Sequence, residues 1–270
     1  GTMQEVIGMQ EHAAATLTEM AFRDATMQDT ILAAGAVPPL LQLLRNGSQL
    51  ARENACRLLW RLCADLHNQG TLVDCGAISE LVTLSKVGSP KAQELAAAVI
   101  SDLAKGAIAE REQQETNKPL VPQSPGDGLA VPPPEQPSPE DEGEGKAPPA
   151  PKDRLSAIAE AGGILPLVGL VTSGNPASKE RAASALWHLS LDPVNQQAVA
   201  RAGGIAPLVM LLEDGNRQAT RFAADALARL AQDNEDNQAL MAKKLVGLLG
   251  SSNEAAQRRS AHMLRALVHK

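Results

Sequence analysis

The chain has 270 residues, a formal charge of −6 and 44% apolar residues, which are ordinary values for a globular protein. It contains no Tyr, two Trp and two Phe. β-Sandwiches and barrels pack with aromatic and β-branched residues, and single-stranded nucleic acids bind on aromatic platforms, so this composition argues against both classes. No apolar run reaches the length of about 18 residues that a membrane helix needs, and the N-terminus lacks the pattern of a signal peptide. We therefore expect no membrane insertion.

Two columns of residues recur along the chain with a spacing of about 41. Glycines at 35, 76, 162 and 203 are spaced 41, 86 and 41, and 86 is one 41-residue repeat plus 45 further residues. The second column is apolar and comprises Met20, Leu62, Leu103, Leu189, Leu230 and Leu267. Two columns with one spacing predict a repeat protein, in which neighbouring units stack because one unit cannot bury its own apolar face.

Each unit is predicted to contain three helices. The first is short and ends at the glycine, the second is rich in Leu, as in 208–212, and the third is long and rich in Ala, as in 219–231. In chain order we expect a leading third helix over about 10–24, then units over about 26–64, 67–105, 154–192, 195–233 and 237–269. The first unit lacks its opening helices, which is typical of a fragment. The last unit has Met241-Ala242-Lys243-Lys244 in place of the glycine turn, as is common in terminal repeats.

The stretch 107–152 differs in composition from the rest of the chain. It holds eleven of the 18 prolines, and nine acidic residues against four basic ones. Such a segment cannot bury enough apolar surface to offset its ordering entropy, so we expect disorder, with a helical start over 108–115. The predicted organisation is N-terminal repeats over 1–106, the insertion over 107–152, and C-terminal repeats over 153–270 that continue the same solenoid.

The units resemble armadillo repeats. The segment 195–209, Asn-Gln-Gln-Ala-Val-Ala-Arg-Ala-Gly-Gly-Ile-Ala-Pro-Leu-Val, is close to the linking pattern of that family, and 183–189, Ala-Ser-Ala-Leu-Trp-His-Leu, resembles its third helix. The resemblance covers almost all of the chain outside the insertion. It implies an all-α fold, a right-handed α-α superhelix, and a non-enzymatic scaffold or adaptor that binds protein partners in the concave groove of the third helices.

The resemblance also places candidate binding residues. Importin-alpha-like members line the groove with a Trp and an Asn four residues on, and the matching pairs here are Ala15/Glu19, Arg57/Arg61, Ala98/Asp102, Ser184/His188, Asp225/Arg229 and His262/Ala266. No pair is Trp/Asn, which argues against binding of a basic nuclear-import signal. The candidate protein-binding residues are Arg57, Trp60, Arg61, Asp102, Ser184, Trp187, His188, Asp225 and Arg229.

Alternatives stay open for these residues. Arg57 and Arg61 lie one turn apart and can face one acidic group of an extended partner segment, or they form a solvated helix face. Helix-wheel counting directs Trp60 and Trp187 toward the groove, where such side chains often carry binding energy, or both pack between neighbouring third helices. His188 is expected to be an ordinary surface histidine.

Other functions have weaker support in the sequence. No phosphate-binding or nucleophile motif occurs, so an enzyme is the least favoured class and no cofactor is expected. Cys63, His67 and Cys75 lack paired Cys-x2-Cys spacing, so no metal is expected, and Cys56 and Cys63 have the spacing of core residues. An odd number of cysteines fits a reducing compartment, cytoplasmic or alternatively nuclear.

The alternative to a groove-binding scaffold is a nucleic-acid-associated or regulatory protein. Six basic residues against one acidic residue between 238 and 270 make the C-terminal end basic, although nucleic acid remains an unfavoured partner. The insertion contains Pro-x-x-Pro and Ser-Pro motifs, and its acidic run 140–144 has the charge to occupy an arginine-bearing groove. An inert spacer is the simpler interpretation of the insertion. We expect a monomer that binds a protein or peptide with an acidic extended segment.

Overall fold

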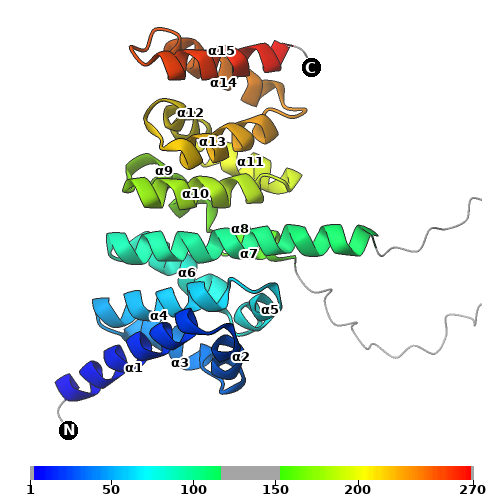
Figure 1. Cartoon of the computed structure of the whole chain (residues 1–270). Coiled ribbons are helices and arrows are strands. Elements are labelled where there is room, and N and C mark those ends of the chain that lie inside the picture. The colour runs from blue at the N-terminus through cyan, green and yellow to red at the C-terminus, as the bar shows by residue number, and fades with distance from the viewer. Residues whose placement is uncertain (1–2, 117–152, 269–270) are drawn as a thin grey trace, which may run out of the picture.

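The computed structural model describes residues 3–116 and 153–268, and every regular element within these ranges is a helix (Figure 1). The helices are α1 (Met3–Arg23), α2 (Ala25–Ala33), α3 (Val37–Asn46), α4 (Gln49–Leu62), α5 (Leu66–Asp74), α6 (Ala77–Val87), α7 (Pro90–Thr116), α8 (Arg154–Glu160), α9 (Ile164–Ser173), α10 (Pro176–Leu189), α11 (Pro193–Arg201), α12 (Ile205–Asp214), α13 (Arg217–Leu230), α14 (Glu235–Leu248) and α15 (Glu254–Val268). None of these helices is by itself long and apolar enough to cross a membrane, although α8 and α9, bent by 77°, together meet the length and composition of a span.

The helices form units of three, and the third helices lie side by side along one face of the molecule (Figure 1). The units are α2–α4, α5–α7, α8–α10 and α11–α13, with α1 as an additional third helix before them and α14–α15 as a two-helix unit at the end. Each third helix packs against the next, from α1 through α4, α7 and α10 to α13. α7 and α10 pack together although the chain between them contains the insertion, so the stack is continuous across it.

Glycines in the left-handed conformation separate the first and second helices of the units. Gly35, Gly76, Gly162 and Gly203 have φ values of 72°, 84°, 76° and 76°. A side chain at such a φ is strained by about 1–2 kcal/mol, which explains the glycine column of the sequence. The last unit has no glycine at this point, and Met241 lies inside the single helix α14, which replaces the separate first and second helices.

The starts of α4, α7, α10 and α13 are each fixed by a capping side chain. Ser48 and Asn216 accept hydrogen bonds from the backbone N–H groups three residues on, at 3.1 and 2.8 Å. Each cap also bonds a glutamate of the preceding third helix, Ser48 to Glu11 and Asn216 to Glu180. One residue therefore both begins a helix and connects two units.

The predicted apolar column is fully buried at Leu62, Leu103, Leu189 and Leu230. The assignment of Met20 to this column is wrong, because Met20 is 40% exposed and its neighbour Ala21 is fully buried. Ala21 precedes Leu62 by 41 residues, the spacing of the other units, whereas Met20 precedes it by 42. The groove pair predicted at Ala15/Glu19 therefore moves by one residue, to 16 and 20.

The helical start predicted for the insertion over 108–115 is confirmed, as the last part of α7. α7 continues to Thr116 because Ala107 is still packed in the core, with 2% of its surface exposed. Beyond that point Arg111 pairs with Asp153 at 2.5 Å, so the extended helix holds the residue at which the described chain resumes. The remainder of the insertion, with its predicted disorder, its Pro-rich motifs and its acidic run over 140–144, lies outside the described residues.

Candidate functional site

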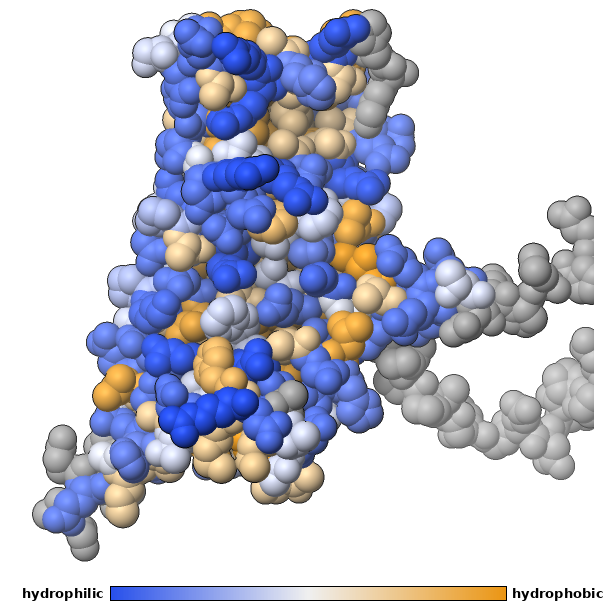
Figure 2. Space-filling model, viewed as in Figure 1, coloured by the Kyte–Doolittle hydropathy of each residue, from blue (hydrophilic) through white to orange (hydrophobic). Residues whose placement is uncertain are grey.

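All four aromatic side chains of the protein lie on third helices. Phe22 is on α1, Trp60 on α4, Trp187 on α10 and Phe222 on α13. Phe22 is 46% exposed and the other three are half-buried, packed against the core with one part and open to solvent with another. We call the surface formed by α1, α4, α7, α10 and α13 the third-helix face, and Figure 2 shows that the side of the molecule carrying it mixes strongly hydrophilic with apolar side chains.

Trp60 bridges three third helices. Its indole Nε1–H donates a hydrogen bond to Oδ2 of Asp102 on α7, at 3.0 Å. The guanidinium of Arg181 on α10 lies 5.3 Å from the centre of the Trp60 ring, the geometry of a cation–π contact. The two side chains meet across α7, which packs on both α4 and α10. Of the two alternatives for Trp60, packing against neighbouring third helices is therefore present, and part of the side chain remains exposed.

The contact with Trp60 affects the pKa of the Asp102 carboxyl group. Burial raises its pKa above the ordinary value, while the hydrogen bond from Trp60 and the positive charges of Arg181 and Lys105 act in the opposite direction. The half-buried Asp102 carboxylate accepts a hydrogen bond from the Trp60 indole and is thus part of the contact between α4 and α7.

The two arginines predicted to act together differ in their contacts. Arg61 donates from Nε to the backbone carbonyl of Ala21 at 3.1 Å, and its guanidinium lies 5.2 Å from the centre of the Phe22 ring. Arg57 is half-buried and has no hydrogen bond or ion pair with any residue that the structure describes. Arg61 is thus held between α4 and α1, whereas the charge of Arg57 is uncompensated.

The prediction that His188 is a surface residue is wrong. His188 is 6% exposed and Ser184, one turn before it, is 7% exposed. Ser184 is covered by α7, where Ser101 donates a hydrogen bond to its hydroxyl at 2.9 Å. Burial lowers the pKa of His188 to about 4, while an interaction with the backbone of Ser184 acts in the opposite direction. Both residues are therefore buried beneath the third-helix face and are not part of its exposed surface.

The remaining predicted residues meet at a shallow cavity of about 400 Å³ on α10 and α13, lined by Trp187, Asp225, Ala228, Arg229 and Gln232. The Trp187 ring stacks on Phe222 with centroids 5.8 Å apart and planes at 27°. Asp225 lies 3.8 Å from Arg221 of the same helix, which is a weak, exposed ion pair. Arg229 is exposed and has no side-chain partner within the described residues.

Three functional candidates were missed from the sequence: Lys105, Arg181 and Phe222. Arg181 and Phe222 occupy one column of the repeat, since they are 41 residues apart, and that spacing was the available signal. Their contacts with the Trp residues depend on side-chain reach across a neighbouring helix, which a helical wheel of one helix does not contain.

The cysteines and histidines do not assemble a metal site in the part of the chain that the structure describes. Cys56 and Cys63 are buried in the core, as their spacing predicts, and burial raises the pKa of both thiols. Cys75 is exposed. The buried thiols of Cys56 and Cys63 pack as small apolar groups.

Comparison with known proteins matches the same repeats. The sequence model of the armadillo/beta-catenin-like repeat matches residues 27–64 and 152–191. Among solved structures, computationally designed armadillo repeat proteins for modular peptide recognition align with a TM-score of 0.69 at 22% identity, over 98% of this chain and 94% of theirs. A designed armadillo repeat protein in complex with the peptide (KR)4 aligns with a TM-score of 0.66 at 19% identity, over 98% of this chain and all of that one. No curated protein matches.

The fold is thus that of an α-helical repeat solenoid whose third helices share one face. The armadillo-repeat model matches two of its units, and the designed armadillo repeat proteins share its fold.

Proposed function

We propose that this protein is a non-enzymatic scaffold that captures an extended segment of a partner protein on its third-helix face. One observation carries the proposal: the four aromatic side chains and the uncompensated Arg57 and Arg229 all lie on third helices. Partly exposed Trp and Arg side chains are the residue types that most often anchor a protein interface.

The designed armadillo proteins support the choice of a peptide as the ligand, since one set was designed for modular peptide recognition and another protein is in complex with the peptide (KR)4. The charges on the third-helix face of this protein favour an acidic peptide and not a basic one such as (KR)4. Its cations include Arg57, Lys105 and Arg229, whereas of its anions Asp102 is bonded to Trp60 and Asp225 lies near Arg221. An acidic segment therefore complements the face better than a basic one.

The test is fluorescence anisotropy with two labelled peptides, (DE)4 and (KR)4. The proposal expects saturable binding of (DE)4, weakened by added salt, and little binding of (KR)4. Arg57→Glu reverses a charge on α4 that has no ion-pair partner among the described residues, so it should weaken (DE)4 binding by about tenfold. Lys243→Glu makes the same charge change on the exposed side of α14 and should leave the affinity within about twofold.

Stronger binding of (KR)4 than of (DE)4 would reject an acidic ligand. Equal affinities of the Arg57→Glu and Lys243→Glu proteins would remove the third-helix face as the site. Natural partners are then sought by capture from cell lysate with mass spectrometry, and only proteins lost with Arg57→Glu and retained with Lys243→Glu count as ligands of this face.

The same proposal includes a monomer in a reducing, cytoplasmic compartment. The buried, unpaired thiols of Cys56 and Cys63 support this setting, because neither has a cysteine partner.

A further inference from the structure

The two tryptophan residues hold the same position of the repeat. Each precedes the buried leucine of its third helix by two residues, Leu62 in α4 and Leu189 in α10. The indole N–H of Trp60 donates a hydrogen bond to Asp102 of the next third helix, α7. The indole N–H of Trp187 has no acceptor within the described residues, and it is not buried. Trp187 therefore retains a free donor, whereas the donor of Trp60 is already bonded.

The residue next to Trp187 that matches Asp102 is an arginine. Asp102 directly precedes the buried Leu103 of α7, and Arg229 directly precedes the buried Leu230 of α13. α13 packs on α10, and α7 packs on α4. Between α10 and α13 the repeat thus replaces a carboxylate, which accepts hydrogen bonds, by a guanidinium, which only donates them. Trp187 and Arg229 both offer donors, so neither can satisfy the other.

Trp187 and Arg229 line the same cavity of about 400 Å³, together with three further residues of which one, Asp225, is acidic. Asp225 lies 3.8 Å from Arg221, one turn before it on α13, and forms no ion pair with Arg229. Arg229 is exposed and pairs with no side chain that the structure describes. Along this side of α13 two arginines therefore flank one aspartate, and the excess positive charge favours an anion.

We propose that this cavity binds a glutamate or aspartate side chain of the partner segment, whose carboxylate accepts hydrogen bonds from the indole N–H of Trp187 and from the guanidinium of Arg229. The ligand carboxylate takes the place that the Asp102 carboxylate holds beside Trp60. Hydrogen bonds from a charged donor to a carboxylate are about twice as strong as neutral ones. The site rests on the function proposed above and adds to it the residues that select an acidic side chain.

The space around Arg229 fits a longer segment better than a small carboxylic acid. Arg229 and Gln232 also line a second cavity, of about 360 Å³, together with residues that include Pro193, Gln196 and Asn234. Because the two cavities share residues at the end of α13, a chain that places a carboxylate on Arg229 can continue from one cavity into the other. The side-chain amides there can bond the backbone groups of an extended chain.

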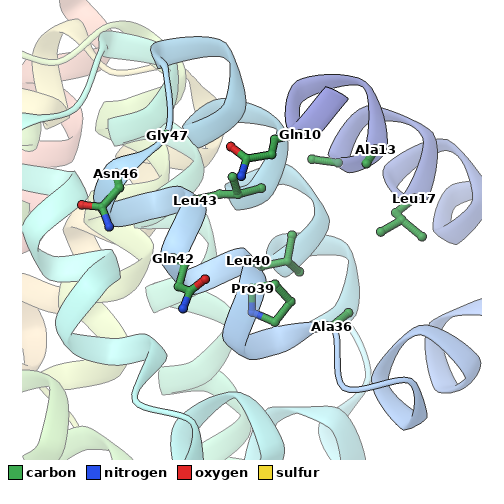
Figure 3. Close-up of a pocket in the computed structure, with 11 residues that line it drawn as sticks. Gln10, Ala13, Leu17, Ala36, Pro39, Leu40, Gln42, Leu43, Asn46 and Gly47 are labelled. Carbon is green, nitrogen blue, oxygen red and sulfur yellow. The ribbon is translucent and has the colours of Figure 1, made fainter. Parts of the chain in front are cut away.

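Another cavity of similar size lacks these charged groups. It has about 380 Å³ and lies between α1 and α3, lined by apolar residues such as Leu17 and Leu43 and by amides such as that of Gln42 (Figure 3). None of the side chains lining it is charged, so it offers no cation to a carboxylate. Selection of an acidic side chain is therefore specific to the cavity between α10 and α13.

The first test is fluorescence anisotropy with (DE)4 whose C-terminus is amidated, so that all its carboxylates are on side chains. Arg229→Gln removes the paired charge and should weaken binding about tenfold. Trp187→Phe keeps an aromatic ring, removes the indole N–H and should weaken binding about threefold. Because both residues bind one carboxylate, the double variant should lose less than the product of the two factors. Arg217→Gln removes the same charge from the exposed first turn of α13 and should change the affinity by less than about twofold.

The second test needs no ligand. Arg229→Asp places a carboxylate at the position that Asp102 holds relative to Trp60, so the indole N–H of Trp187 gains an internal acceptor. Trp187→Phe should then lower the melting temperature by about 2–4 °C more in the Arg229→Asp protein than in the unmodified protein. Trp60→Phe is the matched control, because Trp60 bonds Asp102 in both proteins and its replacement should lower both melting temperatures equally.

Two results overturn the carboxylate site and leave the proposed function standing, provided that Arg57→Glu still weakens (DE)4 binding. One is that Arg229→Gln weakens binding no more than Arg217→Gln does. The other is that Trp187→Phe lowers the melting temperature equally with and without Arg229→Asp. Absence of (DE)4 binding to the unmodified protein refutes the proposed function and this site together. Circular dichroism confirms that each variant is folded, and if a Trp187→Phe protein is not, the comparison of Arg229→Gln with Arg217→Gln decides.

Discussion

Replacing Gly106 by alanine sets two effects against each other. Gly106 lies inside α7, where alanine is favoured over glycine by about 1 kcal/mol. A Cβ atom at this position, however, would lie 1.8 Å from Oε1 and 2.7 Å from Cδ of Gln69. Gln69 is only 3% exposed, so its side chain must leave its present position for the alanine to fit.

The cost follows from the bonds that Gln69 makes. Its Nε2 donates to the carbonyls of Cys63 and Asp102, at 3.0 and 3.2 Å, and its Oε1 accepts from Arg154 at 2.7 Å. Each such bond contributes about 0.5–1.5 kcal/mol, and more where a charged donor is involved, so losing all three costs about 3 kcal/mol. After the gain in helix propensity, Gly106→Ala should lower the free energy of unfolding by about 2 kcal/mol.

Urea denaturation followed by circular dichroism measures this difference. Gly169→Ala is the control, because Gly169 lies within α9 with no atom near its Cβ position, and it should raise stability by up to about 1 kcal/mol. Gln69→Ala removes the obstacle, so Gly106→Ala in that background should no longer destabilise. The reasoning is refuted if Gly106→Ala alone shifts the midpoint upward as Gly169→Ala does.

Three further predictions concern single residues. The pKa of His188 is lowered to about 4, so the unfolded chain takes up this proton at a higher pH than the folded protein does. The free energy of unfolding should therefore be highest above about pH 6.5 and fall by up to about 3 kcal/mol as the pH drops to 4. His188→Gln should flatten this pH dependence in urea titrations. Trp60→Phe removes the donor to Asp102 and should lower the free energy of unfolding by about 1–2 kcal/mol, whereas an unchanged melting temperature would mean that this bond contributes nothing. Gly203→Ala should cost about 1–2 kcal/mol because its φ is 76°, and Gly247→Ala, in a helix with free space around it, should stabilise the protein, both measured by thermal unfolding.

The repeat architecture was predictable because it depends on residue types with few substitutes. Only glycine adopts a φ near 75° without strain, so the turn at Gly162 and Gly203 leaves a periodic mark in the sequence. The fully buried Leu column leaves a second one. A third mark went unused: the glycines at 47, 88, 174 and 215 have the same spacing, and a Cβ there would lie 2.4–2.5 Å from a backbone carbonyl oxygen.

The details of the candidate site were less predictable because they depend on neighbouring helices. No glycine turn of the repeat marks the register of helix α1 in the sequence. The apolar column was therefore placed at Met20, one residue before Ala21, which occupies the buried position. His188 points toward the third-helix face on a helical wheel, but α7 covers that part of α10, as the hydrogen bond between Ser101 and Ser184 shows. A wheel gives the direction of a side chain and not the distance to the next helix.

The junction at the insertion shows how a repeat stack can accept a long interruption. α7 packs on α10 as other third helices pack on their neighbours, so the stack itself needs no special contact there. The added element is the extension of α7, which supplies Glu110 and Arg111 to pair with Arg154 and Asp153. These ion pairs hold both ends of the described chain at the junction against one helix. A repeat solenoid is stabilised by contacts between nearest neighbours, so the fold depends on these ion pairs and on the α7–α10 interface. The length of the segment between Thr116 and Asp153 can therefore vary at little cost in free energy.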